Sequence, residues 1–208
     1  MSNTIHETNR KRWDAGSEQW AKAADARGLW RRLPSEPGLT LTDKEREYLA
    51  DIRGKRVLVL GSGDNHVVFA LAGLGGNVTS VDISQNQLDV AAGRARELDL
   101  SISFIRADVT DLSAIDSNTF DVVYTGGHVA VWVSDIDTYY AEAARVLRPD
   151  GLFIIAEYHP FRRIWKESPD ELAVAFSYFD RGPFEYDVSE DILRPEPGTL
   201  KSYEFHWT

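Results

Sequence analysis

The fold is decided by residues 56–64, which read Arg-Val-Leu-Val-Leu-Gly-Ser-Gly-Asp. Four apolar residues in a row are typical of a strand that is covered on both faces of a parallel sheet. The two glycines after them let the backbone turn sharply and approach a ligand closely. A helix that follows such a turn directs its free N–H groups toward that ligand. The stretch therefore predicts a buried strand that leads into a ligand-binding turn.

Strand and helix patterns alternate after this stretch. Further strands are predicted at residues 77–82, 101–107, 120–124 and 152–156, with helices at 67–74, 84–98 and 134–147 and a weak helical turn at 111–115. Thr42 with Glu45, and Ser84 with Gln87, have the spacing of helix caps, and Ser134 is expected to cap the last of these helices. The first of these caps should start a short helix that buries Tyr48, Leu49 and Ile52. Such alternation predicts an α/β fold, a doubly wound and mostly parallel sheet with helices on both faces.

Composition limits the class of protein. The chain has 208 residues, 43% of them hydrophobic, which suits one main core with appendages. We expect a helical cap segment at 1–53, a ligand-binding core at 54–160 and an aromatic-rich extension at 161–208. The net charge of -10 disfavours a nucleic-acid partner, and the absence of cysteine excludes disulfides, thiolate nucleophiles and cysteine-ligated zinc. With neither a signal peptide nor a membrane span visible, we expect a cytoplasmic protein without a metal site.

The N-terminal segment carries Trp13 and Trp20, which lie seven residues apart and so on one face of a helix. Arg10, Lys11 and Arg12 lie beside them. One interpretation is a surface helix with a solvated charged side. The other is a lid at 5–30 whose tryptophans cover a ligand and whose basic side chains attract a carboxylate, with the loop at 34–38 as its hinge.

Two carboxylates follow predicted strands. Asp82 ends the strand about twenty residues beyond the glycines, where it could accept hydrogen bonds from both hydroxyls of a ribose. Asp108 ends the next strand, where it could accept one from an exocyclic amino group. Either could instead be a loop residue that caps a helix. Together with the glycine turn, the pair favours a ligand that contains a nucleoside.

A dinucleotide fingerprint requires a third glycine where this chain has His66, which disfavours nicotinamide dinucleotides. The sequence instead resembles the class I S-adenosylmethionine-dependent methyltransferases, specifically their type 11-like domain with its Rossmann-like fold. The resemblance covers about half the chain and rests on residues 57–63, 81–84, 107–109, 120–124 and 145–151. It implies S-adenosyl-L-methionine as cofactor, with Gly61 and Gly63 at its methionine part, Asp82 on its ribose, and Ile83, Asp108 and Val109 at its adenine. Ser62, Thr125 and Gly126 complete the implied cofactor site.

Three features depart from the family. Val59 stands where an acidic residue is usual, and Asn65 stands where a glycine is usual. After Glu157 only about fifty residues remain, so we expect a short or C-terminally incomplete fold that lacks the usual hairpin. Residues 173–179 and 183–188 are expected to form a hairpin over the site instead, and residues 201–207 another strand. An open sheet edge would also allow a homodimer.

Methyl transfer needs two reactants held in line and shielded from water. Aromatic residues for such a cover are Trp132, Tyr158, Phe161, Trp165, Tyr178 and Phe179. His128 and His159 follow the fourth and fifth predicted strands and could accept a proton, and Glu157 could orient the acceptor. Each could equally be a loop residue with no catalytic role. We expect methyl transfer to a small-molecule acceptor. The alternatives are a non-catalytic binding or assembly protein on the same scaffold and a nicotinamide-dependent oxidoreductase.

Overall fold

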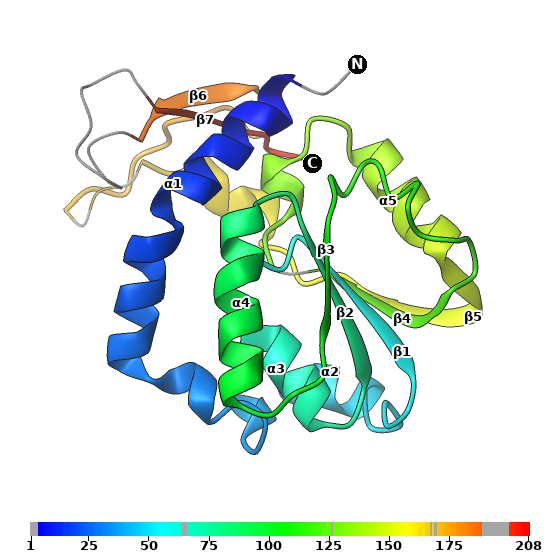
Figure 1. Ribbon diagram of the computed structural model, residues 1–208. Helices are drawn as coiled ribbons and strands as arrows, with labels where there is room; N and C mark the ends of the chain where they lie inside the picture. The colour runs from blue at the N-terminus through cyan, green and yellow to red at the C-terminus, as the bar shows by residue number, and fades with distance from the viewer. Residues whose placement is uncertain (1–3, 64–65, 126, 167, 169, 189–199) are drawn as a thin grey trace.

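A five-stranded parallel sheet in the order β3-β2-β1-β4-β5 forms the centre of the computed structural model (Figure 1). The structure describes residues 4–63, 66–125, 127–166, 168, 170–188 and 200–208. The strands of this sheet are β1 (Arg56–Leu60), β2 (Asn77–Asp82), β3 (Ser103–Arg106), β4 (Phe120–Thr125) and β5 (Leu147–Ile154). The order reverses between β1 and β4, where ligands bind in open α/β sheets. The predicted α/β fold is confirmed.

The two faces of the sheet carry separate hydrophobic cores. Val57 and Val59 of β1 pack with α3 (His66–Gly73) and α4 (Gln85–Glu97). Leu58 and Leu60 point to the other face and pack with α5 (Ile136–Val146). All four β1 side chains are fully buried. An unbroken apolar strand therefore results from its central position between two layers of helices, which Figure 1 shows on either side of the sheet.

Local signals set most element boundaries, with some differences. The capping box of Thr42 and Glu45 starts α2 (Asp43–Tyr48), and the Ser84 side chain accepts a hydrogen bond from the Gln87 N–H at 3.2 Å. The cap of α5 is Asp135 rather than Ser134, because the Asp135 carboxylate accepts from the Thr138 N–H at 3.0 Å. Strand β5 begins at residue 147 rather than 152, directly after α5.

Two smaller predictions were wrong. Tyr48 is 60% exposed, whereas Leu49 and Ile52 are buried as expected. Tyr48 is the last residue of α2 and lies beside Lys44 on the solvent side, with the amine 5.6 Å from its ring. Residues 111–115 form turns without a helix.

The extension after β5 differs from the predicted hairpin. Strand β6 (Phe184–Asp187) pairs antiparallel with β7 (Lys201–Glu204). Residues 173–175 bond back to 164–166 instead, with Lys166 N–H donating to Ala173 O at 2.8 Å and Ala175 N–H to Ile164 O at 2.7 Å. Their backbone groups are thus not available to β6. The strand predicted at 201–207 is confirmed as β7, and in the described residues the main sheet ends at β5.

Helix α1 (Thr4–Arg27) lies along α4 and reaches β7, as Figure 1 shows. The Asn9 amide donates to Tyr203 O at 2.9 Å and its oxygen accepts from Tyr203 N–H at 2.7 Å. Arg94 of α4, 4% exposed, donates to Ala21 O at 3.2 Å and to Asp25 at 3.0 Å. The short helices η1 (Leu29–Arg31), η2 (Pro37–Leu39), η3 (Ala130–Trp132) and η4 (Pro160–Ile164) complete the chain. In the described segments, we find no helix with the length and apolarity that crossing a bilayer requires.

Candidate functional site

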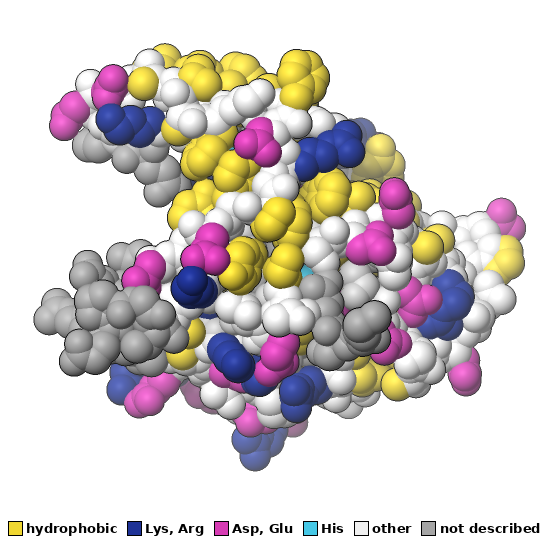
Figure 2. All heavy atoms as spheres, turned by 90° about the horizontal axis from the view of Figure 1, so that it is seen from above, with side chains coloured by type: hydrophobic (Ala, Val, Ile, Leu, Met, Phe, Trp, Pro, Cys, Tyr) yellow, Lys and Arg dark blue, Asp and Glu magenta, His cyan; other side chains and the backbone are white. Residues whose placement is uncertain are grey.

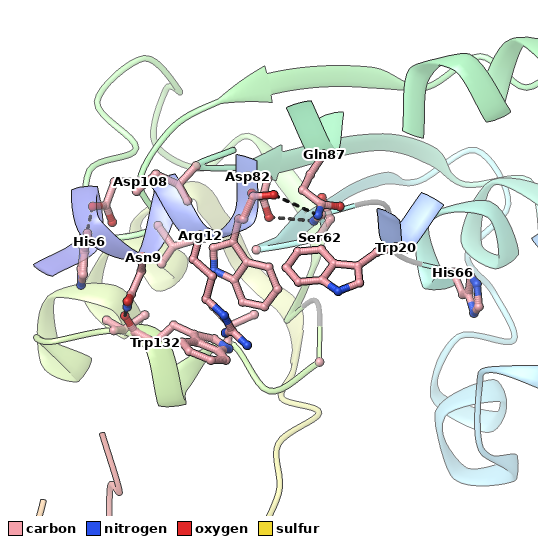
Figure 3. Close-up of a pocket in the computed structure, with 18 residues that line it drawn as sticks. His6, Asn9, Arg12, Trp20, Ser62, His66, Asp82, Gln87, Asp108 and Trp132 are labelled. Carbon is pink, nitrogen blue, oxygen red and sulfur yellow. Dashed lines mark hydrogen bonds and ion pairs between the residues drawn. The ribbon is translucent and has the colours of Figure 1, made fainter. Parts of the chain in front are cut away.

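A cavity of about 590 Å³ opens at the carboxyl ends of β1, β2 and β3, beneath α1. That volume is in the range of small-molecule and cofactor sites. Its lining comprises His6, Asn9, Arg12, Trp13, Trp20, Gly61, Ser62, Gly63, His66, Asp82, Ile83, Gln87, Asp108, Val109, Gly127, Val129, Trp132 and Val133. Figure 3 shows how α1 and the strand ends supply opposite walls.

The glycine turn after β1 forms the floor of the cavity. Gly61 and Gly63 have φ angles of 60° and 53°, a region that side chains other than glycine rarely adopt. A Cβ atom on Gly61 would lie 2.6 Å from a methyl carbon of Val129. Gly61 is therefore required by the close approach of the β4–η3 loop. Asp64, Asn65 and Gly126 lie outside the described residues.

Asp82 ends β2 and holds the glycine turn. Its carboxylate accepts from the Gly63 N–H at 2.7 Å and from the Ser84 N–H at 2.8 Å. The side chain is 8% exposed and still lines the cavity. The carboxylate therefore fixes the turn while it faces the cavity. Figure 3 shows Asp82 beside Ser62 and Gln87.

Asp108 follows β3 and is joined to α1. Its carboxylate lies 2.6 Å from His6 Nδ1 and accepts from the Thr110 N–H at 2.9 Å. The other ring nitrogen of His6, Nε2, accepts from the Ser134 N–H at 2.8 Å. Burial alone would raise the pKa of Asp108, but its hydrogen bonds with His6 and Thr110 outweigh burial and hold the pKa below its ordinary value.

One face of α1 supplies the opposite wall. His6, Asn9, Trp13 and Trp20 recur at intervals of three, four and seven residues, which places them on one side of a helix. The Trp13 ring lies 5.3 Å from that of Trp20 and 5.0 Å from that of Trp132. The tryptophan pair was identified from sequence, whereas His6 and Asn9 were not. The same helical spacing, extended to polar residues, could have found them.

The remaining residues of the implied cofactor site divide between cavity and core. Ile83 and Val109 line the cavity, as does Ser62. Thr125 does not: it is fully buried, and its hydroxyl accepts from the Ala156 N–H at 2.7 Å, which ties β4 to β5. These contacts give Thr125 a structural role in the sheet.

The three candidate catalytic residues do not line the cavity. The His128 ring stacks on Tyr158 with 3.2 Å between centroids. His159 is exposed and caps η4, with its Nδ1 accepting from the Phe161 N–H at 3.2 Å. Glu157 accepts from the Ala130 N–H at 3.0 Å and so supports the loop that carries Val129.

Two of these groups have shifted pKa values. Burial raises the pKa of Glu157, against the lowering effect of hydrogen bonds from the Ala130 and Val129 N–H groups. Burial, together with Arg163 and Arg162, lowers the pKa of His128. A neutral imidazole at neutral pH is the form that can accept a proton.

The face in Figure 2 carries charges of both signs, and most of the predicted aromatic cover lies outside the cavity. On the face seen from above, acidic and basic side chains are interspersed rather than separated by sign (Figure 2). Of the aromatic cover, only Trp132 lines the cavity, while Tyr158, Phe161 and Phe179 are exposed. Across the described ranges, no cluster of three or more histidine, aspartate or glutamate side chains could hold a metal ion.

Comparison with known proteins finds similarity to methyltransferases. Residues 58–155 match the methyltransferase domain family. The uncharacterized methyltransferase YbaJ of Bacillus subtilis is 27% identical over 76% of this chain and 64% of its own length. The ubiquinone biosynthesis O-methyltransferase of Bartonella bacilliformis is 30% identical over 60% of this chain and 48% of its own. The chain thus spans about half to two thirds of the length of these relatives.

Solved structures agree on the fold. The PH0226 protein of Pyrococcus horikoshii has a TM-score of 0.53 at 29% identity, covering 64% of this chain and 59% of its own. An S-adenosylmethionine dependent methyltransferase of Mesorhizobium loti has a TM-score of 0.57 at 24% identity, covering 78% and 72%. The sequence match points to a methyltransferase rather than to a nicotinamide-dependent oxidoreductase, whereas the sheet order is shared with dinucleotide-binding folds. By sequence over residues 58–155 and by fold, the chain is similar to the class I S-adenosylmethionine-dependent methyltransferases.

Proposed function

We propose that the chain transfers a methyl group from S-adenosylmethionine to a small-molecule acceptor. The observation that carries this proposal is the cavity itself. One wall presents Asp82, Asp108 and the glycine turn, and the other presents the tryptophans of α1. The first wall offers acceptors for a nucleoside, and the second excludes water.

The residues present fit the cofactor. The carboxylate of Asp82 faces the cavity, where it would accept hydrogen bonds from ribose hydroxyls, and Ile83 and Val109 provide apolar contact for a flat base. A Cβ atom on Gly63 would lie 3.6 Å from Gln87 Oε1 and 3.9 Å from Asp82 Oδ2, so the turn passes close to both polar groups. When bound, S-adenosylmethionine would supply an electrophilic methyl group.

The chain's own contribution is positioning and the exclusion of water. Trp13, Trp20 and Trp132 form an apolar wall. Such a wall favours methyl transfer because the positive charge on the sulfur is lost in that step. His128 is proposed as the group that takes up a proton, because it lies between Gly127 and Val129, which line the cavity, and its lowered pKa keeps it neutral. Glu157 is proposed to orient the loop above the cavity through Ala130.

Calorimetric titration tests this function. S-adenosylmethionine and S-adenosylhomocysteine should bind, and a nicotinamide dinucleotide should not. Asp82→Asn should weaken binding by roughly 1.5 to 3 kcal/mol, the scale of hydrogen bonds to a charged group. Asp51→Asn removes the same charge from a side chain that is 95% exposed and should change nothing. Unchanged affinity in folded Asp82→Asn would contradict the ribose assignment.

A second candidate is a non-catalytic binding protein on the same scaffold. Val59, fully buried where the family usually has an acidic residue, favours it. Cofactor binding without methyl transfer to any of a broad panel of small acceptors would support this candidate over the enzyme.

A further inference from the structure

Arg12 is the one lysine or arginine among the described residues that line the cavity. Its guanidinium carbon lies 4.8 Å from the centre of the Trp13 ring and 4.6 Å from that of Trp132. The Nε and Nη1 atoms are buried. Figure 3 shows Arg12 and Trp132 side by side in the cavity. Two indole faces thus hold a planar cation in a fixed place.

The neighbouring basic residues are arranged differently. Arg10 pairs with Glu7 and Asp14 on α1 itself, with its Nε donating to Glu7 at 2.8 Å. Lys11 is exposed, and neither residue lines the cavity. The helix therefore directs a single member of its basic cluster inward. Arg10 offers a matched control of the same chemistry.

The acidic residues of the lining follow β2 and β3, on the strand-end side of the cavity. Asp82 accepts from Gly63 and Ser84, and Asp108 accepts from His6 and Thr110. The two carboxylates thus support the glycine turn and the docking of α1. Arg12 is the positive group that the cavity presents on the side of Trp132.

We propose that Arg12 is a binding residue for a carboxylate in this cavity. A guanidinium matches a carboxylate with two parallel hydrogen bonds, and the apolar walls around it strengthen the attraction because they exclude water. The proposal rests on the proposed function, and two molecules could bring the carboxylate there. One is the amino-acid end of the cofactor, and the other is an acidic acceptor with a flat body that packs on the tryptophans.

Calorimetry on the full chain with matched ligands tests the proposal. S-adenosylhomocysteine is compared with 5′-methylthioadenosine, which lacks the amino-acid end. Benzoate is compared with the neutral benzamide, with methylthioadenosine present throughout. Each pair is measured with the wild type, Arg12→Gln, Arg12→Lys and Arg10→Gln. Thermal melts establish that each variant is folded.

The proposal expects Arg12→Gln to weaken one carboxylate ligand by about tenfold or more while its neutral partner is unchanged. The affinity of Arg12→Lys for that ligand should lie between those of Arg12→Gln and the wild type, since lysine keeps the charge without the planar fork. The affinity of Arg10→Gln should match that of the wild type. Selective loss of S-adenosylhomocysteine assigns the cofactor as the source, and selective loss of benzoate assigns the acceptor.

Equal effects on the acid and neutral member of both pairs, or no effect on either pair, would overturn the role of Arg12. A wild type that binds neither nucleoside would instead overturn the proposed function. In that case the benzoate pair, measured alone, still decides whether Arg12 binds a carboxylate.

Discussion

His6 and Asp108, which are 102 residues apart in the sequence, meet with 2.6 Å between His6 Nδ1 and the carboxylate. The contact joins the first helix to the end of β3, at the position that the family resemblance assigns to adenine. Since Nδ1 must donate to the carboxylate, the accepting Nε2 is matched to the Ser134 N–H. One imidazole therefore fixes α1 at two points of the cavity wall.

The first prediction is that Asp108 makes the free energy of unfolding depend on pH in the acidic range. Its folded pKa is depressed, so its contribution is present above the unfolded pKa of about 4 and is lost as the pH falls through the lower folded value. Urea unfolding between about pH 7 and pH 3 should show a steeper loss in the wild type than in Asp108→Asn. Parallel curves would mean that the pair contributes no linked stability.

His6→Ala addresses the same pair at neutral pH. It leaves the Ser134 N–H and a partly buried carboxylate without their partner, so we expect about 1 to 3 kcal/mol of lost stability. Lys22→Ala, at a side chain on α1 that is 75% exposed, should cost less than about 0.5 kcal/mol. Equal effects of the two substitutions in urea unfolding would contradict the anchoring role of His6.

A second prediction compares two glycines with positive φ. Gly54→Ala at φ 77° has no atom within 4 Å of the new Cβ, so it should cost only the strain of the left-handed region, about 1 to 2 kcal/mol. Gly61→Ala at φ 60° adds a 2.6 Å contact with Val129 and should cost clearly more. Calorimetry should also show loss of cofactor binding in Gly61→Ala alone. Similar unfolding energies for the two variants would show that the Val129 contact relaxes without cost.

The third prediction concerns Glu157, whose folded pKa is raised by burial. A raised carboxyl pKa stabilises the protonated form, so the native state loses stability as the pH rises through that value. Glu157→Gln removes the charge, and its side-chain oxygen can still accept from Ala130. The melting temperature at pH 7 should therefore rise, and the difference should shrink below about pH 4.5. A lower melting temperature at pH 7 would show that the charge itself is stabilising.

A fourth prediction uses two glycines within helices. A Cβ on Gly16 would lie 2.5 Å from the Trp20 ring, whereas one on Gly93 of α4 meets nothing within 4 Å. Gly93→Ala should stabilise by about 0.5 to 1 kcal/mol because alanine favours helix. Gly16→Ala should instead displace Trp20 from the cavity wall. Tryptophan fluorescence should change in Gly16→Ala and not in Gly93→Ala, and an unchanged spectrum in both would contradict the packing of Trp20 on Gly16.

The lid hypothesis gives the fifth prediction. Trp30 and Leu33 are 1% and 0% exposed in the main core, so a moving segment must end before them, at Gly28 (φ 65°) rather than in the loop at 34–38. Trypsin should cut after Lys22 and Arg27 more slowly when S-adenosylhomocysteine is bound. Equal protection with and without ligand would make α1 a fixed helix.

The sequence predicted the sheet well because each strand and cap is specified locally. Val57 to Leu60, with its unbroken apolar run, and Ser84, with its cap, needed no knowledge of distant residues. The antiparallel ribbon was mispredicted because residues 173–175 and 184–187 have equally strand-like compositions, and only their partners at 164–166 and 201–204 distinguish them. Aromatic composition alone does not determine which strands pair or in which register.

The site followed the same division. Gly61 and Asp82 were expected at the site because each comes at the end of an apolar strand pattern, and both line the cavity. The sequence did not assign His6 and Asn9 to the site, and it assigned Trp132 only to a general aromatic cover. Their partners are remote in the sequence: His6 contacts Asp108, Asn9 contacts Tyr203, and Trp132 contacts Arg12. Contacts between residues so far apart in the sequence produce no short spacing pattern from which they could be predicted.

The pairing of the Asn9 amide with the Tyr203 backbone bears on the order of events during synthesis. Translation delivers Asn9 194 residues before Tyr203, and domains generally fold as they emerge from the ribosome. The sheet can therefore form while α1 still lacks this partner, and the cavity wall is completed only when β7 has emerged. A nascent chain stalled ahead of β7 would hold α1 through Asp108 and α4, without the backbone contact to Tyr203.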